Sequence, residues 1–231
     1  MPRFLVLAAA ALVCLPAASC GLISSDVTDF NLKLPEKPFN VDTADWMLSV
    51  QGSTMPAIAC PAVDCTAATD MFCAQGACTA DCDSGGHCQA HVAVAVSQKF
   101  DLAHESPELA KIDSQAGIKV TVEAITFVVK ENTLNVTSPP LSVFLAPQGV
   151  LDPQSPEAVN IGTAEAVPAM QTGEVVILFS ATGKHAMEQY MGDYKTPFSV
   201  IVAGDVTMHA GDPVPKGKLS GVVSVTAHAG I

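Results

Sequence analysis

The sequence has almost no arginine: Arg3 is the only one among 231 residues, which include 23 aspartates and glutamates. Arginine supplies the planar fork that binds phosphate or carboxylate groups through two hydrogen bonds at once. Its scarcity and the acidic excess exclude the function classes that depend on a basic surface. We therefore expect no nucleic-acid partner and no binding to anionic lipid headgroups.

Long apolar runs are also scarce. The uninterrupted run at the start covers residues 4–15, and as a helix it would reach roughly 18 Å, well short of a bilayer core of about 30 Å. The rest of the sequence holds no run of eighteen apolar residues. Because Arg3 precedes this run and small residues follow it at 16–19, the start is typical of a cleaved secretion signal.

The motifs of several common enzyme classes are missing. The sequence contains no Gly-x-Ser-x-Gly elbow, no His-Glu-x-x-His and no Cys-x-x-Cys-His. Gly183-Lys184 and Gly217-Lys218 are not followed by the Ser or Thr of a phosphate-binding loop. We therefore expect a non-catalytic protein without a cofactor. The alternative is an exported enzyme whose site is assembled in space from scattered side chains, with His87, His104, His185, Glu188 and Asp193 as candidates.

The residues before Cys20 resemble the lipobox of bacterial lipoproteins. Residues 17–19 are Ala-Ala-Ser, the small side chains that cleavage requires, and Cys20 follows them directly. The resemblance implies removal of the signal peptide at 1–19, a diacylglyceryl thioether on Cys20 and a palmitate-type acyl group on the amino terminus, which together anchor a protein stably to a membrane. Gly21, in place of the Asp typical of inner-membrane retention, implies the outer membrane of the bacterial cell envelope. Plain secretion without lipidation is the alternative.

Cysteines gather in one segment. Six of the eight lie within 29 residues, and none follows them. An even, clustered set in an exported chain predicts three disulfides that staple a segment with little core of its own. The spacing does not choose among the possible pairings. The six residues are Cys60, Cys65, Cys73, Cys78, Cys82 and Cys88.

Two patterns in the same segment bear on metal binding. His87, Cys88 and His91 offer the imidazole and thiolate groups that zinc prefers. In an oxidising compartment, however, we expect Cys88 in a disulfide and His91 on an exposed strand face. The acidic turn from Asp81 to Gly86 is similar to a calcium loop but lacks its closing Glu. We therefore expect no bound metal.

Alternation of apolar and polar residues dominates the chain from residue 91 onward and predicts strands. We interpret the fold class as all-β: an antiparallel immunoglobulin-like β-sandwich with one or two short helices and a disulfide-rich N-terminal segment. Helices are expected at 184–191 and after Ser106, where a Ser cap precedes a Pro. The first strand is expected at 45–50.

Three finer expectations follow from the same alternation. The buried parity changes near Ala124, which indicates a bulge. The segment 175–179 is apolar on both faces and is expected to be a central strand. In the strand that begins near residue 198, Val202 is expected inside, and His209 outside.

Residues 118–206 also resemble the late-embryogenesis-abundant type 2 and WHy domains, which are immunoglobulin-like sandwiches with one helix. The likeness is carried by the residues at 131–135, 167–169 and 186–191, although Thr133 stands where the family's Asn-Pro-Asn has proline. The resemblance implies a structural or stress-related binding role and no catalytic residues.

These observations predict a signal peptide at 1–19, a tether at 20–40 and a β-sandwich domain at 41–231, with the cysteine-rich segment at 55–90. The expected function is that of an exported, membrane-tethered lipoprotein that acts as a binding or structural module of the envelope. Its partners would be the membrane, through the lipid on Cys20, and an envelope protein or surface ligand.

Overall fold

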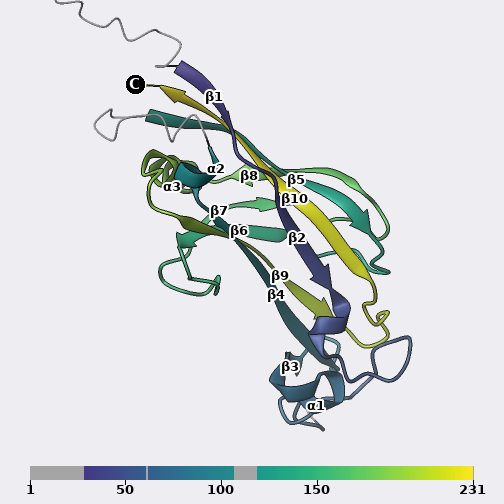
Figure 1. The fold of residues 1–231 in the computed structure, drawn as a ribbon. Coiled ribbons are helices and arrows are strands. Elements are labelled where there is room, and N and C mark those ends of the chain that lie inside the picture. Colours follow the sequence, from purple (N-terminus) through teal and green to yellow (C-terminus); the bar gives the residue numbers. More distant parts are fainter. Residues whose placement is uncertain (1–28, 61, 107–118, 231) are drawn as a thin grey trace, which may run out of the picture.

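The fold is built from ten β-strands (Figure 1), in a computed structural model that describes residues 29–60, 62–106 and 119–230. The strands are β1 (Asp29–Lys33), β2 (Lys37–Asp42), β3 (Thr79–Cys82), β4 (Cys88–Phe100), β5 (Lys119–Asn132), β6 (Leu141–Pro147), β7 (Val159–Ala164), β8 (Gly173–Phe179), β9 (Phe198–Met208) and β10 (Lys218–Gly230). All pairings are antiparallel, in the order β1-β10-β5-β8-β7-β6-β9-β4-β3. Strand β2 continues the line of β1 along the same edge of β10.

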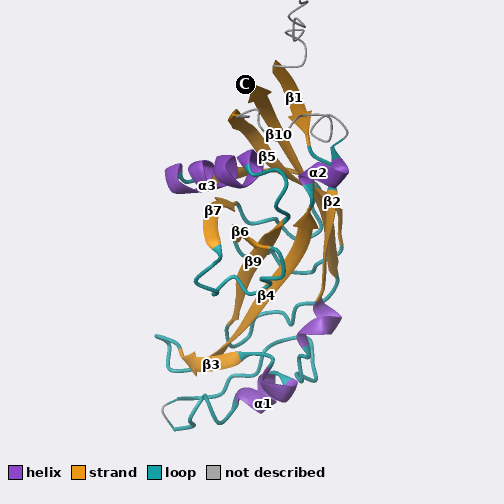
Figure 2. Cartoon of the chain, turned by 60° about the vertical axis from the view of Figure 1, so that its left-hand side comes forward, coloured by secondary structure: helices purple, strands orange, loops and turns teal. Residues whose placement is uncertain are grey.

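The strands make one strongly curled sheet, and β8 joins its two halves. Residues 173–176 of β8 pair with β5, whereas residues 177–179 pair with β7. The curl turns the two halves toward each other, and the main hydrophobic core fills the space between them (Figure 2). The expected mostly β, antiparallel architecture is confirmed, but a single continuous sheet takes the place of two separate ones.

The phase change expected near Ala124 is a bulge in β5. Thr226 of β10 pairs with Ala124, but the next residue, Ala227, pairs with Val122, so Glu123 is an extra residue without a partner in the ladder. A bulge moves the following residues to the opposite face. Ile125 and every second residue after it, as far as Val129, therefore face the core.

The helix expected at 184–191 is confirmed within α3 (Ala181–Gly192), which covers one end of the core. Ser180 caps it by accepting a hydrogen bond from the backbone N–H of Gly183 at 2.8 Å. The helix expected after Ser106 lies outside the described residues. The short α2 (Leu102–Glu105) precedes it.

The prediction of a strand at 45–50 is wrong. The chain forms the 3₁₀ turn η2 (Thr43–Trp46) there, because Asp42 accepts a hydrogen bond from the N–H of Ala44 and caps the turn. Met47 follows with a left-handed φ of 52°, which ends the turn and prevents extension into a strand.

The expected tether also differs from the structure, because β1 and β2 occupy residues 29–42. Apolar residues alternate with polar ones there, and Leu34 and Phe39 are 1% and 2% exposed. They complete the core at the edge of β10. The part of the expected tether before residue 29 lies outside the described residues.

The placements expected for Val202 and His209 are confirmed: Val202 in β9 is 9% exposed, and His209, which directly follows β9, is exposed. Strand β8 occupies an interior position in the strand order, as expected. Its apolar outer face is nevertheless open: Val176 is 57% and Leu178 60% exposed.

The curl brings β2 beside β4, but no ladder joins them in the described part of the chain. Lys37 of β2 instead reaches Glu105 of α2, with 2.6 Å between Nζ and Oε1. Both side chains are about four-fifths buried, and the ammonium group also lies 5.4 Å from the centre of the Phe100 ring. This ion pair links the two edges of the sheet where backbone hydrogen bonds do not.

Residues 43–60 and 62–91 form a second compact part, which we call the disulfide lobe. It contains α1 (Thr69–Phe72), η3 (Ala74–Gly76) and strand β3. Its own small core is built around Phe72, Trp46 and the buried cysteines, and it packs on Met208 and Val214. In both views the lobe lies at the end of the molecule opposite to the start of β1 and the end of β10 (Figures 1 and 2).

Candidate functional site

The predicted disulfides are confirmed, and the structure supplies their pairing. Cys82 and Cys88 face each other at the closed end of the β3–β4 hairpin. Each is bonded to a cysteine of the preceding loop rather than to the other, and the third bridge closes a short turn beside α1. The hairpin is thereby fixed to the loop at two neighbouring points. The pairs are Cys60–Cys82, Cys65–Cys88 and Cys73–Cys78.

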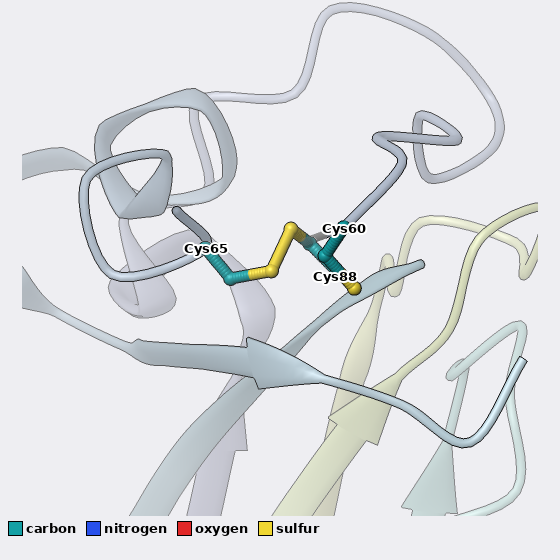
Figure 3. A group of neighbouring side chains, drawn as sticks. All are labelled: Cys60, Cys65 and Cys88. Carbon is teal, nitrogen blue, oxygen red and sulfur yellow. A yellow bond between two sulfur atoms is a disulfide. The ribbon is translucent and has the colours of Figure 1, made fainter. Parts of the chain in front are cut away.

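Three cysteines of the lobe lie close together in space (Figure 3). The sulfur atoms of Cys60, Cys65 and Cys88 are within 4.8 Å of one another, and within the described ranges this is the one such group of potential metal ligands. Only the thiolate form of cysteine binds metal strongly. Because all three sulfurs are in disulfides, this group is a structural staple, and Cys88 is not available to His87 and His91.

A polar cluster lies beside the disulfides, across β3, β4 and β9. The His91 ring is at its centre: Nε2 is 3.2 Å from Oδ1 of Asp81, and Nδ1 is 3.3 Å from Oδ1 of Asp205. The Thr207 hydroxyl is 3.1 Å from Nδ1. Hydrogen bonds from Gln89 and then from His91 hold the pKa of Asp81 below its ordinary value of 3.8.

A second acidic side chain orders the hairpin turn next to this cluster. Asp83 accepts hydrogen bonds at 2.8 Å from the backbone N–H groups of Gly85 and His87. The bond from His87 is the main reason why the pKa of Asp83 is lowered. The ring of His209 lies 3.9 Å from the other carboxylate oxygen. Both aspartates of the hairpin therefore stay ionised into the acidic range.

The lobe carries acidic groups without basic ones. Between Lys37 and Lys99 the sequence has six aspartates and no lysine or arginine. Strand β9 adds Asp205 to the same face, because Asp205 pairs with Ala93, two residues along β4 from His91. We call the surface formed by Asp81, His91, Asp205 and Thr207 the acidic face. The sequence pattern points to His91 but not to Asp205 and Thr207, since only the register of β4 with β9 brings them together.

The interior of the curled sheet is not a second site. A narrow apolar cleft runs between the halves, lined by side chains such as Phe39, Trp46 and Val202, and its free volume is about 50 Å³. Sites for small organic ligands usually enclose about 300–1,000 Å³. The cleft is therefore a gap in core packing, too small for a ligand of ordinary size.

The structure scatters the side chains proposed for an enzymatic site. His87 lies in the hairpin turn of the lobe, whereas His104 is in α2 and His185 and Glu188 are in α3, at the far end of the molecule. Asp193 follows α3 as its C-cap. Among the described residues, no hydrogen bond or ion pair joins any two of these five side chains.

No protein-family model matches this chain, and no curated protein matches it either. Within the described ranges, none of the helices has both the length and the apolar character needed to cross a bilayer. The features of the described structure that bear on function are the acidic face and the position of the lobe at one end of the curled sheet.

Proposed function

We propose that this protein is an exported, membrane-tethered lipoprotein that acts as a non-catalytic binding module of the bacterial envelope. Its disulfide lobe would be held away from the membrane and would bind a cationic partner through the acidic face. The lipid on Cys20 anchors the chain in the outer membrane in this proposal, which takes the lipobox resemblance as its starting point.

The observation that carries the proposal is the distance between the two ends of the molecule. Strand β1 begins beside the last residues of β10, because Asp29 pairs with Gly230. The lobe lies near the other end of the 13-residue β10, and at 3.2–3.4 Å per residue that strand spans roughly 40 Å. Few residues separate Cys20 from β1, so an anchor at Cys20 leaves the lobe as the part most distant from the bilayer.

The chemistry of the lobe supports a cationic partner. Its aspartates have no lysine or arginine neighbours in sequence, and the pKa of Asp81 in the acidic face is lowered, so this carboxylate stays ionised well below neutral pH. Such a surface attracts basic molecules and repels acidic ones. The disulfides hold its shape, which reduces the entropy lost on binding.

One arrangement favours the competing class, an exported enzyme. The Thr207 hydroxyl, the His91 ring and the Asp81 carboxylate form a chain of polar contacts similar to a nucleophile, base and orienting acid. Thr207 and Asp81 are exposed on an open strand face, however, and catalytic groups of this kind normally lie in a concave, water-excluding site. We therefore favour binding.

We include the immunoglobulin-like classification and the relation to type 2 late-embryogenesis-abundant and WHy domains in the proposal. The support is an antiparallel sheet whose halves enclose one core, together with the single longer helix α3 in the matching part of the sequence. A binding role without catalytic residues agrees with that relation.

Replacement of Cys20 by alanine should abolish lipidation and release the protein from membranes, because the thioether and the acylated amino terminus both need this cysteine. Cells labelled with a clickable palmitate analogue would be fractionated, with Cys14→Ala as the matched control in the signal segment. We expect label and membrane association in wild type and Cys14→Ala and neither in Cys20→Ala. Equal labelling of all three would disprove lipidation at Cys20.

Binding to the acidic face can be measured with a fluorescent octalysine peptide in 150 mM salt. Asp81→Asn/Asp205→Asn removes two carboxylates from the face, and Glu123→Gln/Glu131→Gln removes two exposed carboxylates from β5. Exposed charge pairs contribute up to about 1 kcal/mol each, so the first variant should bind about five- to tenfold more weakly and the second nearly like wild type. Equal weakening in both would mean that the negative charge acts diffusely and that the lobe is not the site.

A further inference from the structure

A hollow on the outer side of the sheet adjoins the acidic face. Its floor is formed by residues of β4, β9 and β6 that alternate with the core residues of these strands and therefore point away from the core. Residues 151–154, in the loop between β6 and β7, complete its lining. Asp205 belongs both to this floor and to the acidic face, so the two surfaces are continuous. The outward-pointing floor residues are Ala93, Ala95, Ser142, Phe144, Ala203 and Asp205.

The loop that completes the hollow is held in shape by its own hydrogen bonds. The Asp152 carboxylate accepts a hydrogen bond from the N–H of Gln154 at 2.8 Å, and the Asp152 carbonyl oxygen accepts one from the N–H of Ser155 at 3.1 Å. Pro153 stands at the second position of this turn, where its fixed φ is favoured. The hollow has a volume of about 440 Å³, within the range of about 300–1,000 Å³ typical of binding sites. It therefore exists before a ligand binds.

The hollow combines apolar surface with negative charge. Leu151 at its edge is 64% exposed, and both alanines of β4 on its floor are exposed. Asp152 and Asp205 also line it, whereas no described lysine or arginine does. Asp205 contacts His91 through Oδ1, and no described residue forms a hydrogen bond with its Oδ2. Such a surface favours a ligand that carries both an apolar group and a positive charge.

We propose that this hollow binds an apolar side chain of the cationic partner, which is a basic protein segment with a residue such as leucine two positions from a lysine or arginine. The inference rests on the proposed function and names the chemical class of its partner. Residues two apart in an extended segment point to the same side. The leucine can therefore enter the hollow while a flanking basic side chain meets Asp205 or Asp152, which line the same hollow. The apolar side chain supplies affinity and the charges supply specificity.

The test compares two fluorescein-labelled peptides of eight residues by fluorescence anisotropy at 150 mM salt. One peptide has leucine at its fourth position and lysine elsewhere, and the other has serine in place of the leucine. Their charge is the same, so diffuse attraction to acidic groups acts on both equally. We expect the leucine peptide to bind wild type at least fivefold more tightly, because the hollow removes its apolar side chain from water.

Two pairs of variants locate this advantage of the leucine peptide. Ala95→Phe fills the hollow from an exposed position, and Ala124→Phe is its matched control at an exposed position of β5. Leu151→Ser removes apolar surface from the hollow, and Leu178→Ser is its matched control, since Leu178 is 60% exposed on β8. The advantage should fall below twofold in Ala95→Phe and Leu151→Ser and should be unchanged in both controls. Thermal melts would show that each variant is folded.

Asp81→Asn separates this inference from the proposed function, because Asp81 belongs to the acidic face but does not line the hollow. It should weaken both peptides by the same factor and leave the advantage of leucine intact. If it weakens both peptides but leucine has no advantage in wild type, the hollow is not a site and the proposed function stands. If it weakens neither peptide while Ala95→Phe removes the advantage, the hollow is a site and the acidic face is not.

Three further results would overturn the proposal. The first is no binding of either peptide to wild type, which would also count against the proposed function. The second is an equal loss of the leucine advantage in Ala124→Phe. The third is a dimer in sedimentation velocity that Ala95→Phe dissociates, because the hollow would then hold a second copy of this chain rather than a basic partner.

Discussion

Substitution of Gly183 by alanine should destabilise the protein strongly, although alanine is the better helix former. Gly183 lies in the first turn of α3, which packs directly on the backbone of β7. A Cβ atom at this position would be 2.0 Å from the carbonyl oxygen of Ile161 and 2.3 Å from its Cα. These are backbone atoms of a paired strand and cannot rotate away, so the helix must move.

Overpacking of this kind costs about 1–3 kcal/mol and sometimes more, which exceeds the gain of about 1 kcal/mol in helix propensity. We expect a net loss near 2 kcal/mol and a Tm lower by about 4–8 °C. At Gly192, at the other end of α3, an added Cβ would meet no atom within 4 Å. Gly192→Ala should be neutral or slightly stabilising in the same differential scanning calorimetry experiment. A stable Gly183→Ala protein would show that α3 does not dock closely on β7.

A buried carboxylate in β9 should have the largest effect of all. Val200 is 2% exposed and lies between Leu145 of β6 and Gln98 of β4. In Val200→Asp the new carboxylate meets apolar side chains of the core on its face of the sheet, so it must remain unpaired or take up a proton. We expect a loss of more than about 4 kcal/mol, comparable to the whole stability of many domains.

The matched control uses the same substitution on the opposite side of the sheet. Val176 of β8 is 57% exposed, so Val176→Asp keeps its carboxylate hydrated and should change stability by less than about 1 kcal/mol. Urea unfolding followed by circular dichroism compares the two directly. Comparable losses in both variants would contradict the assignment of inner and outer faces.

The parts of the fold that sequence predicts well are those in which burial leaves a periodic trace. Val202 is buried and His209 exposed as expected, and the alternation is clear in the second half of β9, where Asp205 and Thr207 are exposed and Met208 is buried. The bulge at Glu123 is visible in the sequence as a change of apolar phase, since an extra residue moves the rest of β5 to the other face. Cysteine clustering likewise predicts bridges, because a segment of this size has too small a core of its own to be stable without them.

The parts that sequence misses depend on partners distant along the chain. Residues 29–34 and 37–42 do alternate apolar with polar side chains, but both segments are short, and the strand that they pair with, β10, lies almost 200 residues further along the chain. Alternation at residues 45–50 predicts a strand, but the Asp42 cap closes a local turn first. The acidic face combines strands 10 and more than 100 residues apart in sequence, and no local pattern contains that register. The pairing of the cysteines is missed for the same reason, because it depends on how the loop folds against the β3–β4 hairpin and not on the spacing of the cysteines.

The position of β10 determines the order in which this molecule can fold. The first two strands, β1 and β2, bond to β10, and β10 also bonds to β5. Because a chain is synthesised from its N-terminus, residues 29–42 are available long before residues 218–230 are made. Contacts of such high sequence separation form slowly, so the first strands to be made are the last to be ordered. During that interval their unpaired edges are available to chaperones and proteases, and shortening the chain by its last strand would make this vulnerable state permanent.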